Sequence, residues 1–293
     1  MHRLTRLLQL AVTRWALLAL VIVAAAGLGL VSTGANAQDP TSTSDAGSAL
    51  SETIPPCPPP GPYDGRLAPH PYQPGDPICS AEGTGVLRRV PLSTEMTAAT
   101  MQKNVYVWTS ASGLKGIMVW RTVSNPSLGS DDTQYHTMHA GGAGGKWIEI
   151  GWSKFGNGTR EIYVETNDHY WGYASQYPIS TGQTIQVDLD GLPGNNNWEA
   201  MLYWNGTWQQ LKVINIGTVI ALNENIFVES FTNDSNWPTL PQTWVQDAQL
   251  YRCAPDCHWV RWDTTIPNSS THGDDPYHIH FTNQYYKWYA HRH

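Results

Sequence analysis

Residues 198–214 read W-E-A-M-L-Y-W-N-G-T-W-Q-Q-L-K-V-I, and this stretch decides the fold class. Asn205-Gly206 at its centre is a dipeptide that two-residue hairpin turns favour, because both turn positions need a positive φ. The flanking segments, 198–204 and 208–214, are rich in aromatic and branched residues, which are typical of strands. The stretch therefore predicts a β-hairpin.

The same pattern of strands and turns extends over residues 104–250. Short segments in which apolar residues recur at every second position are separated by turn signals such as Asn157-Gly158 and Thr181-Gly182. No convincing helical stripe occurs after the first 37 residues. Many short strands without intervening helices predict an all-β protein with two antiparallel sheets, a β-sandwich or jelly roll. The predicted strands are 104–109, 115–123, 133–139, 146–154, 160–166, 184–189, 198–204, 208–214, 225–231 and 244–250.

The first 37 residues have the features of an export signal. Three arginines precede or begin an apolar segment that runs from Trp15 to about Val31. Ala35-Asn36-Ala37 then matches the A-x-A pattern of a cleavage site. We expect a signal peptide at 1–37 and a secreted, extracellular protein. An uncleaved membrane anchor is the alternative, because the apolar segment is nearly long enough to span a bilayer.

Charge and composition narrow the class of partner. Removal of residues 1–37 takes away three arginines and no acidic residue, so the net charge falls from −7 to −10. Such an acidic chain is poorly suited to bind a phosphate backbone or an anionic membrane. We therefore expect no nucleic acid partner, and no membrane partner after cleavage of the signal. The chain has 14 Trp and 14 Tyr, whose flat rings with a polar edge suit a groove for sugar or peptide as well as ordinary packing.

The four cysteines lie in the exported part of the chain, where disulfides are favoured. We prefer the local pairs Cys57–Cys79 and Cys253–Cys257, because each pair closes a short loop outside the central strands. The alternative is a zinc site at Cys253, Cys257 and His258, although their spacing matches no familiar zinc finger.

Four segments follow from the composition. The signal peptide at 1–37 precedes a disordered or Pro-rich linker or pro-segment at 38–100, which has few large apolar residues. A β-sandwich domain of catalytic type is expected at 101–252. A polar tail with cysteine and histidine residues is expected at 253–293.

Two predicted strands carry a glutamate on an otherwise aromatic face. In the segment 147–152, Ile148 and Ile150 share one face of the strand, whereas Trp147 and Glu149 share the other. In the segment 225–231, Glu229 alternates in the same way with an aliphatic face. Because the aliphatic faces should form the core between the sheets, both glutamates should project from an outer face. Two carboxyls brought close together have different pKa values, so one serves as an acid and the other as a base. Two unrelated surface glutamates are the alternative.

These two segments resemble those of the glutamic peptidases. W-I-E-I-G-W at 147–152 looks like the I-E-x-G-W segment of the neprosin-type enzymes, and F-V-E at 227–229 resembles their I-V-E segment. N-E-N-I-F-V-E-S-F at 223–231 is similar to the N-A-E-W-I-V-E-D-F segment of the related fungal enzymes, the eqolisins. I-S-T-G-Q-T-I-Q-V at 179–187 is similar to their I-S-A-G-D-x-I-x-V segment. The resemblance covers roughly residues 133–250.

The resemblance implies a concanavalin-like β-sandwich and a glutamic peptidase that cleaves a polypeptide substrate. It implies that Glu149 and Glu229 are the catalytic pair and that Trp147, Tyr163, Glu165 and Asn225 contribute to substrate binding. One ionised glutamate would take a proton from water, and the other would protonate the leaving nitrogen. This scheme uses no metal and no other cofactor. Glu161 and Glu199, which lack the motif, should matter little.

Two other functions use the same features. A jelly-roll glycanase also places two glutamates on an aromatic face, and its substrate would be a polysaccharide. A carbohydrate-binding β-sandwich of lectin type would use the aromatic residues alone. Hydrolysis of casein at acid pH, hydrolysis of a glucan, or glucan binding without turnover would distinguish the three.

Overall fold

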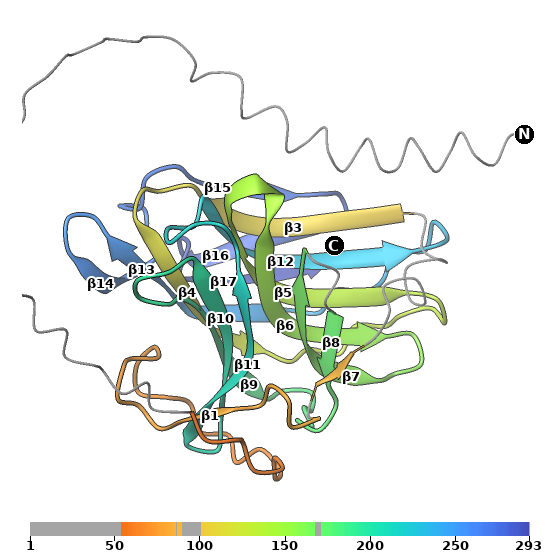
Figure 1. Cartoon of the computed structure of the whole chain (residues 1–293). Helices are drawn as coiled ribbons and strands as arrows, with labels where there is room; N and C mark the ends of the chain where they lie inside the picture. Colours follow the sequence, from red (N-terminus) through yellow and green to blue (C-terminus); the bar gives the residue numbers. More distant parts are fainter. Residues whose placement is uncertain (1–53, 86, 90–100, 168–170, 293) are drawn as a thin grey trace, which may run out of the picture. The chain divides into compact units, whose positions relative to one another are not determined.

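The structure is a computed structural model that describes residues 54–85, 87–89, 101–167 and 171–292 (Figure 1). The predicted signal peptide at 1–37 and much of the predicted linker, residues 38–53 and 90–100, lie outside the described residues. Within the described ranges, no helix is long and apolar enough to cross a membrane.

One sheet has nine strands. Eight of them follow the order β1-β11-β10-β9-β4-β13-β17-β16, and β14 pairs with β13. The neighbours are antiparallel except for β1 and β11, which are parallel. Their bounds are Ile78–Ser80 (β1), Thr207–Asn215 (β11), Asn197–Trp204 (β10), Thr184–Gly191 (β9), Leu114–Thr122 (β4), Thr243–Cys253 (β13), Lys287–Arg292 (β17), Tyr277–Asn283 (β16) and Cys257–Arg261 (β14).

The second sheet has eight antiparallel strands in the order β15-β3-β12-β5-β6-β7-β8-β2. Their bounds are Ser269–Gly273 (β15), Met101–Thr109 (β3), Asn223–Thr232 (β12), Thr133–Gly141 (β5), Trp147–Phe155 (β6), Arg160–Thr166 (β7), Trp171–Ala174 (β8) and Arg88–Arg89 (β2). A short 3₁₀ helix, η1 (Ala143–Gly145), connects β5 to β6. The predicted all-β sandwich of two sheets is confirmed.

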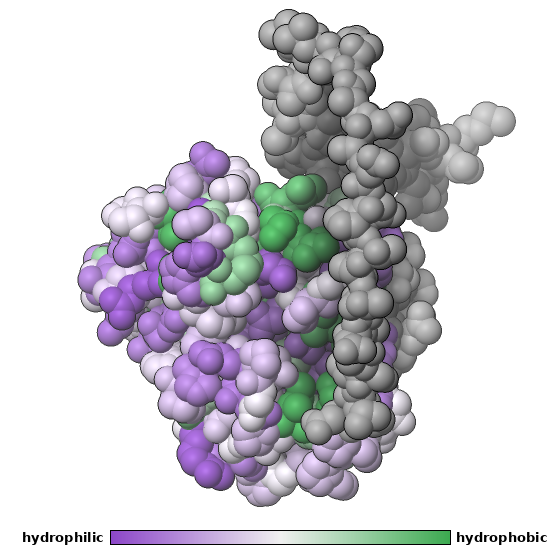
Figure 2. All heavy atoms as spheres, turned by 60° about the vertical axis from the view of Figure 1, so that its left-hand side comes forward, coloured by the Kyte–Doolittle hydropathy of each residue, from purple (hydrophilic) through white to green (hydrophobic). Residues whose placement is uncertain are grey.

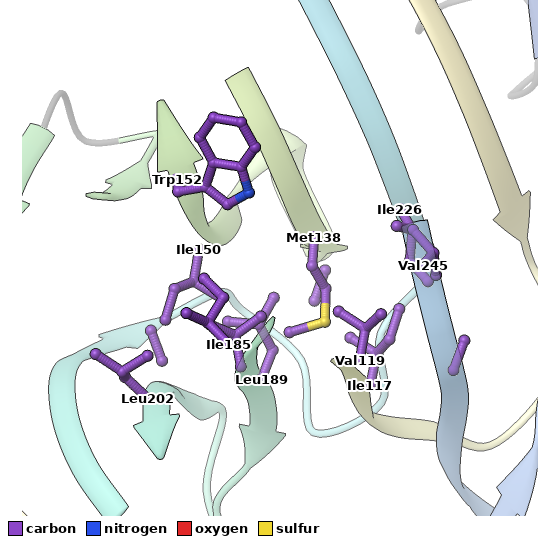
Figure 3. Packing of buried hydrophobic residues seen from close by; sticks show 14 of the residues in the cluster. Ile117, Val119, Met138, Ile150, Trp152, Ile185, Leu189, Leu202, Ile226 and Val245 are labelled. Atoms are coloured by element: carbon purple, nitrogen blue, oxygen red, sulfur yellow. The ribbon is translucent and has the colours of Figure 1, made fainter. Parts of the chain in front are cut away.

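The core lies between the two sheets because alternate side chains of each strand are apolar. Ile117 and Val119 of β4 and Met138 of β5 are fully buried, and Figure 3 shows them packed together between the sheets. Ile148 and Ile150 of β6 belong to the same core, which confirms the face assigned to them from the alternation. The surface differs: Figure 2 shows one face on which hydrophilic and near-neutral residues predominate. Among the described residues, only Val219 and Leu222 are large apolar side chains with substantial exposure.

All ten strands predicted from the alternation are present, within a few residues at their ends. The hairpin predicted at residues 198–214 is formed by β10 and β11, with Trp204 opposite Thr207. Asn205 and Gly206 have φ angles of 50° and 92°, so the turn uses the conformation for which this dipeptide is suited.

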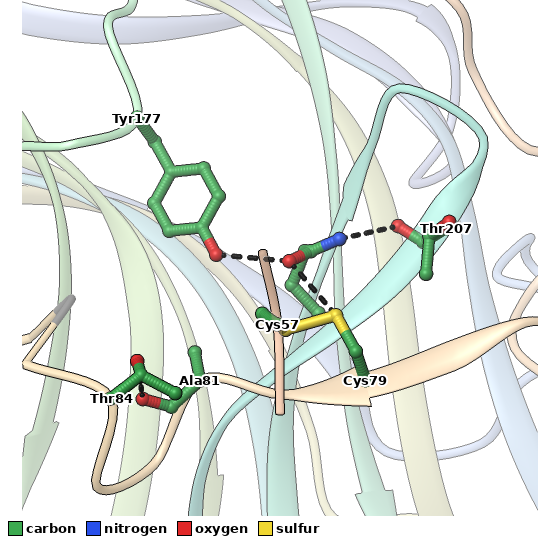
Figure 4. Close-up of a disulfide and its surroundings, with 7 residues drawn as sticks. Cys57, Cys79, Ala81, Thr84, Tyr177 and Thr207 are labelled. Atoms are coloured by element: carbon green, nitrogen blue, oxygen red, sulfur yellow. Dashed lines mark hydrogen bonds between the residues drawn. A yellow bond between two sulfur atoms is a disulfide. The ribbon is translucent and has the colours of Figure 1, made fainter. Parts of the chain in front are cut away.

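The expected boundary at residue 100 differs from the structure, because much of 54–89 packs on the sandwich. The disulfide Cys57–Cys79 fixes this segment, and β1 adds it to the edge of the nine-stranded sheet. Tyr63 also packs its ring 4.5 Å from that of Trp204. Gln209 of β11 lies beside the disulfide, with its Oε1 3.1 Å from Cys79 Sγ, and this oxygen accepts a hydrogen bond from the hydroxyl of Tyr177, whose position Figure 4 shows. A crosslink and a few aromatic contacts thus order a segment that has little apolar surface of its own.

The expected boundary at residue 252 is also different, because residues 257–292 supply four further strands. Trp288 and Ala290 of β17 and Tyr277 of β16 are buried in the core, so this region is part of the sandwich. The disulfide Cys253–Cys257 joins β13 to β14. Both predicted cysteine pairs are therefore confirmed, and neither Cys253 nor Cys257 is a thiolate that could bind zinc.

Candidate active site

Three rows of side chains cross the outer face of the eight-stranded sheet. Residues directly opposite each other in an antiparallel pair project from the same face. Each row crosses β12, β5, β6 and β7 in that order, and we name it by its member on β5. The His139 row is Asn225, His139, Glu149 and Glu165; the Thr137 row is Phe227, Thr137, Gly151 and Tyr163; the Tyr135 row is Glu229, Tyr135, Ser153 and Glu161.

The register places Glu149 and Glu229 on one face of one sheet, as the alternation predicted. They are not neighbours, because β5 lies between their strands. Glu149 belongs to the His139 row and Glu229 to the Tyr135 row, so the Thr137 row separates them along the strands. Whatever joins the two carboxyls must therefore lie above the Thr137 row.

The two glutamates have different surroundings. Glu149 is buried, with 8% of its surface exposed, and it lies between His139 and Glu165 in the register. Glu229 is half-buried, and its carboxylate accepts a hydrogen bond from the Gln102 side chain of the adjacent strand β3. Burial disfavours the charged form of a carboxyl, whereas a donated hydrogen bond favours it. The two carboxyls therefore differ in burial and in the hydrogen-bond donor that the structure describes for Glu229.

Tyr163 belongs to the Thr137 row, which separates the rows of the two glutamates. Its side chain is 1% exposed, and its ring meets that of Tyr135 edge to face at 5.3 Å. Burial is the main cause that raises the pKa of the phenol well above its ordinary value, and the charges of Glu149, Glu165 and Glu229 raise it further. A hydrogen bond with Thr137 acts in the opposite direction. The neutral hydroxyl of Tyr163 is thus a hydrogen-bond donor within electrostatic reach of all three glutamates.

His139 and Asn225 form a second polar pair on this face. The Asn225 amide donates a hydrogen bond of 3.1 Å to His139 Nδ1, which leaves the proton of a neutral imidazole on Nε2. Burial lowers the pKa of His139 to about 4, so the ring is neutral above that pH. The Asn225 amide, which the sequence analysis assigned to substrate binding, is therefore engaged in holding His139.

The other two predicted binding residues lie at the same end of the site. Trp147 is half-buried at the start of β6, and its ring centroid is 5.8 Å from that of His139. Glu165 is half-buried on β7, directly opposite Glu149. All six residues predicted for the site therefore project from this one face.

Sequence reasoning missed the members of the site on β5. Tyr135, Thr137 and His139 alternate along 133–141 with the core residues His136 and Met138, and this alternation was the available signal. The alternation alone does not assign these residues to the site, because nothing in the sequence shows that β5 lies between the two glutamate strands.

Glu161, which lacks the motif and is expected from the sequence to matter little, projects from the same face as the two glutamates. It is buried in the Tyr135 row, in line with Glu229, and its carboxylate is 3.5 Å from the Arg88 guanidinium. The alternation of β7 puts residues 161, 163 and 165 on the same face, so Glu161 shares the face of Glu149.

A second group of buried acids lies on the other sheet. Asp190 of β9 is opposite Glu199 of β10, and Asp188 precedes Asp190 on the same face. Burial raises the pKa of Glu199 to about 6 and raises those of both aspartates well above their ordinary values. The backbone N–H of Tyr72 donates to Asp188, so the segment at residues 68–72 covers this group. It is a packed feature of the nine-stranded sheet rather than an open site.

Comparison with known proteins gives a likeness of structure only. No family model matches the chain, and no curated protein matches its sequence. The scytalido-glutamic peptidase bound to a peptide-based transition state analogue is similar at 14% identity, with 66% of this chain and 98% of that chain covered and a TM-score of 0.48. SCP-B, a member of the eqolisin family of peptidases in complex with the tripeptide Ala-Ile-His, has the same identity and coverage and a TM-score of 0.44.

The β-glucanase of Bacillus licheniformis is also similar, at 10% identity, with 60% of this chain and 78% of that chain covered and a TM-score of 0.28. At these identities a likeness concerns the fold alone.

Proposed function

We propose that this protein is an acid-active glutamic endopeptidase that uses Glu149 and Glu229 to hydrolyse a polypeptide. The observation that carries the proposal is the position of these two glutamates on one face of one sheet, on either side of the row that holds Tyr163. The sequence segments around both residues, which resemble those of glutamic peptidases, support it independently.

The proposed chemistry divides the work between an ionised and a protonated carboxyl. Glu229 is the general base that takes a proton from the attacking water, because it is the more exposed and accepts a hydrogen bond from Gln102. The new C–O bond leaves a negative charge on the former carbonyl oxygen. Glu149 is the acid that first polarises this carbonyl and then protonates the leaving nitrogen. Because the two groups interact, the pair titrates jointly.

Three neutral side chains complete the proposed site. The Tyr163 hydroxyl is a donor for the developing oxyanion, since its raised pKa keeps it protonated. Asn225 fixes His139 beside Glu149, and Trp147 with Glu165 borders the bound peptide at this end. No step of this chemistry passes through a thiol.

The test compares wild-type protein with the Glu149→Gln and Glu229→Gln variants on a denatured protein substrate between acid and neutral pH. Activity should peak below neutral pH, because one carboxyl must keep its proton. Each substitution should reduce kcat by about a thousandfold or more, and the double variant should be scarcely worse, because the two carboxyls act as a unit. Glu82→Gln is the control, since Glu82 is exposed and pairs with Lys212 of the other sheet at 2.6 Å.

Two results would contradict the proposal. Proteolysis that persists in either single variant would remove the glutamate pair from the mechanism. Hydrolysis of a glucan that both substitutions abolish, without any proteolysis, would assign the same pair to a glycanase.

A further inference from the structure

Arg121 is a buried cation directly beneath the candidate site. It belongs to β4 of the nine-stranded sheet, where Ile185 and Val245 are its register partners, and its side chain is 1% exposed. Its guanidinium crosses the core to the other sheet. Nη1 donates to the carbonyl oxygen of Thr137 at 2.6 Å, and Nη2 donates to that of Phe227 at 2.7 Å.

The charge of Arg121 has no acidic partner in the core. None of the salt bridges among the described residues includes it, and its Nε has no hydrogen-bond acceptor there. Burial lowers its pKa to about 9, so the side chain is still charged at acid and neutral pH. Its ionisable neighbour in the core, His136, is kept neutral by burial and by the charge of Arg121 itself. A buried charge that is balanced by carbonyl oxygens alone is costly, so other negative charges should compensate it.

The position of the Arg121 guanidinium indicates that the compensating negative charges are those of Glu149 and Glu229. Thr137 and Phe227 are opposite each other in the Thr137 row. Glu149 lies two residues to one side of this row and Glu229 two residues to the other. Arg121 is therefore below the row that separates the two glutamates, and Tyr163, a member of that row, makes a hydrogen bond with Thr137 on the outer face.

We propose that Arg121 is a positioning residue of the site, and that its charge acts through the sheet to keep one of the two glutamates ionised. This role rests on the proposed peptidase function. The two hydrogen bonds also fix the carbonyl of Thr137 on β5, between the two glutamate strands, and that of Phe227 on β12, the strand that carries Glu229. Other ionisable groups on the described outer face are Glu165, Glu161 with its partner Arg88, Tyr135, Tyr106, His272 with its partner Asp274, and the neutral His139 and Tyr163. Of these, Arg88 and a protonated His272 add positive charge, and each faces an acid of its own, Glu161 and Asp274 respectively.

The sign of the effect follows from electrostatics. A positive charge favours the ionised form of a carboxyl, so loss of the charge should raise the pKa values of the pair. Each glutamate is displaced from the guanidinium by two residues along the strand, by about one strand spacing across the strands, and by the thickness of the sheet. Together these displacements place each carboxyl about 10 Å from the guanidinium. At that distance, with an effective dielectric constant of about 20, the expected shift is about one pH unit.

The experiment follows the titration of the two glutamates by carbon NMR of protein labelled at the glutamate carboxyl carbons, with Glu149→Gln and Glu229→Gln to assign the signals. In wild-type protein, the lower pKa of the pair should lie below the ordinary glutamate value of about 4.3. Arg121→Met and Arg121→Gln should each raise it by about one unit, whereas Arg121→Lys, which keeps a charge, should raise it by much less. The pH profile of proteolysis should move upward by the same amount.

Arg252→Met is the matched control. Arg252 also donates to a backbone carbonyl, that of Ser112, but it is half-buried, so that solvent and salt screen its charge more than that of Arg121, and it donates to neither Thr137 nor Phe227. The inference is overturned if, in wild-type protein, the lower of the two glutamate pKa values is equal to or above the ordinary glutamate value. This test does not require either neutral variant to fold. An unchanged titration in a folded neutral variant also overturns it. Because the titration needs no turnover, an inactive wild-type protein would refute the peptidase and leave the electrostatic role of Arg121 to be decided by NMR alone.

Discussion

Gly151 is the position where the fold and the candidate site depend most closely on each other. It lies in the Thr137 row, between Thr137 and Tyr163. A Cβ atom at this position would be 2.8 Å from Thr137 Cα and 2.9 Å from the His136 carbonyl carbon, and nearer still to the His136 oxygen. All three atoms belong to the backbone of β5, so no side-chain rotation relieves the overlap. We predict that Gly151→Ala forces β5 and β6 apart.

The magnitude follows from the contact distances. Carbon atoms pack at about 3.5–4.0 Å, so the strands would have to separate by about 1 Å. Such a shift strains or breaks about two ladder hydrogen bonds, worth about 1 kcal/mol each, and overpacking costs about 1–3 kcal/mol more. We expect a loss of about 3–5 kcal/mol in the free energy of unfolding.

Urea unfolding followed by tryptophan fluorescence measures this loss. Gly61→Ala is the control, because Gly61 has no positive φ and a Cβ there would have no atom within 4 Å. That substitution should be neutral or slightly stabilising, since it restricts the unfolded chain. If the two variants were equally stable, β5 and β6 could not be as closely apposed at Gly151 as the structure has them.

The remaining predictions concern the free energy of unfolding after removal of each disulfide and after removal of two titrating side chains. Replacing both cysteines of Cys57–Cys79 by serine should lower the free energy of unfolding by about 3 kcal/mol, and the same change at Cys253–Cys257 by about 2 kcal/mol, because the bridges span 22 and 4 residues. Urea unfolding of the two variants should show this order, and the reverse order would contradict the loop-entropy argument. Glu199→Gln should remove about 2 kcal/mol of pH dependence from the free energy of unfolding. The pKa of Glu199 is raised from 4.5 to about 6, so the stabilisation by the protonated side chain is complete below pH 4.5 and is lost as the pH rises through 6. Wild-type protein should therefore lose more stability than the variant between pH 4.5 and pH 7, and equal losses in urea unfolding would refute the assignment. His139→Gln should act in the opposite sense, because the lowered pKa of His139 makes the wild-type protein lose stability as the pH falls from 6.5 through 4; an unchanged acid limb in the variant would show that His139 does not titrate as described.

Local alternation in the sequence was sufficient for the central strands and for the face of each glutamate. Glu149 and Glu229 could be placed on an outer face because Ile148, Ile150, Ile226 and Val228 had to be in the core, and all four are buried there. The hairpin at Asn205-Gly206 and the two short cysteine loops are equally local features.

Features that depend on strand order were not accessible in this way. β1 and β2 have only three and two residues, and β15, S-S-T-H-G, has no apolar alternation, so their pairing partners alone define them as strands. The position of β5 between β6 and β12 is a property of the whole topology. For the same reason the sequence could not show that Arg121 of one sheet donates to Thr137 and Phe227 of the other.

The position of β5 also limits how the two glutamates can cooperate. Two strand spacings, about 9.6 Å, separate β6 from β12, and the partners of Glu149 and Glu229 on β5 are four residues apart. Both side chains must therefore lean over the Thr137 row before a water molecule can lie between their carboxyls. The Thr137 row itself has no charged member, because it consists of Phe227, Thr137, Gly151 and the protonated Tyr163. In the mechanism that we propose, this neutral row with the cation Arg121 beneath it would let one carboxyl stay ionised while the other keeps its proton, which is the division of charge that general acid and base catalysis requires.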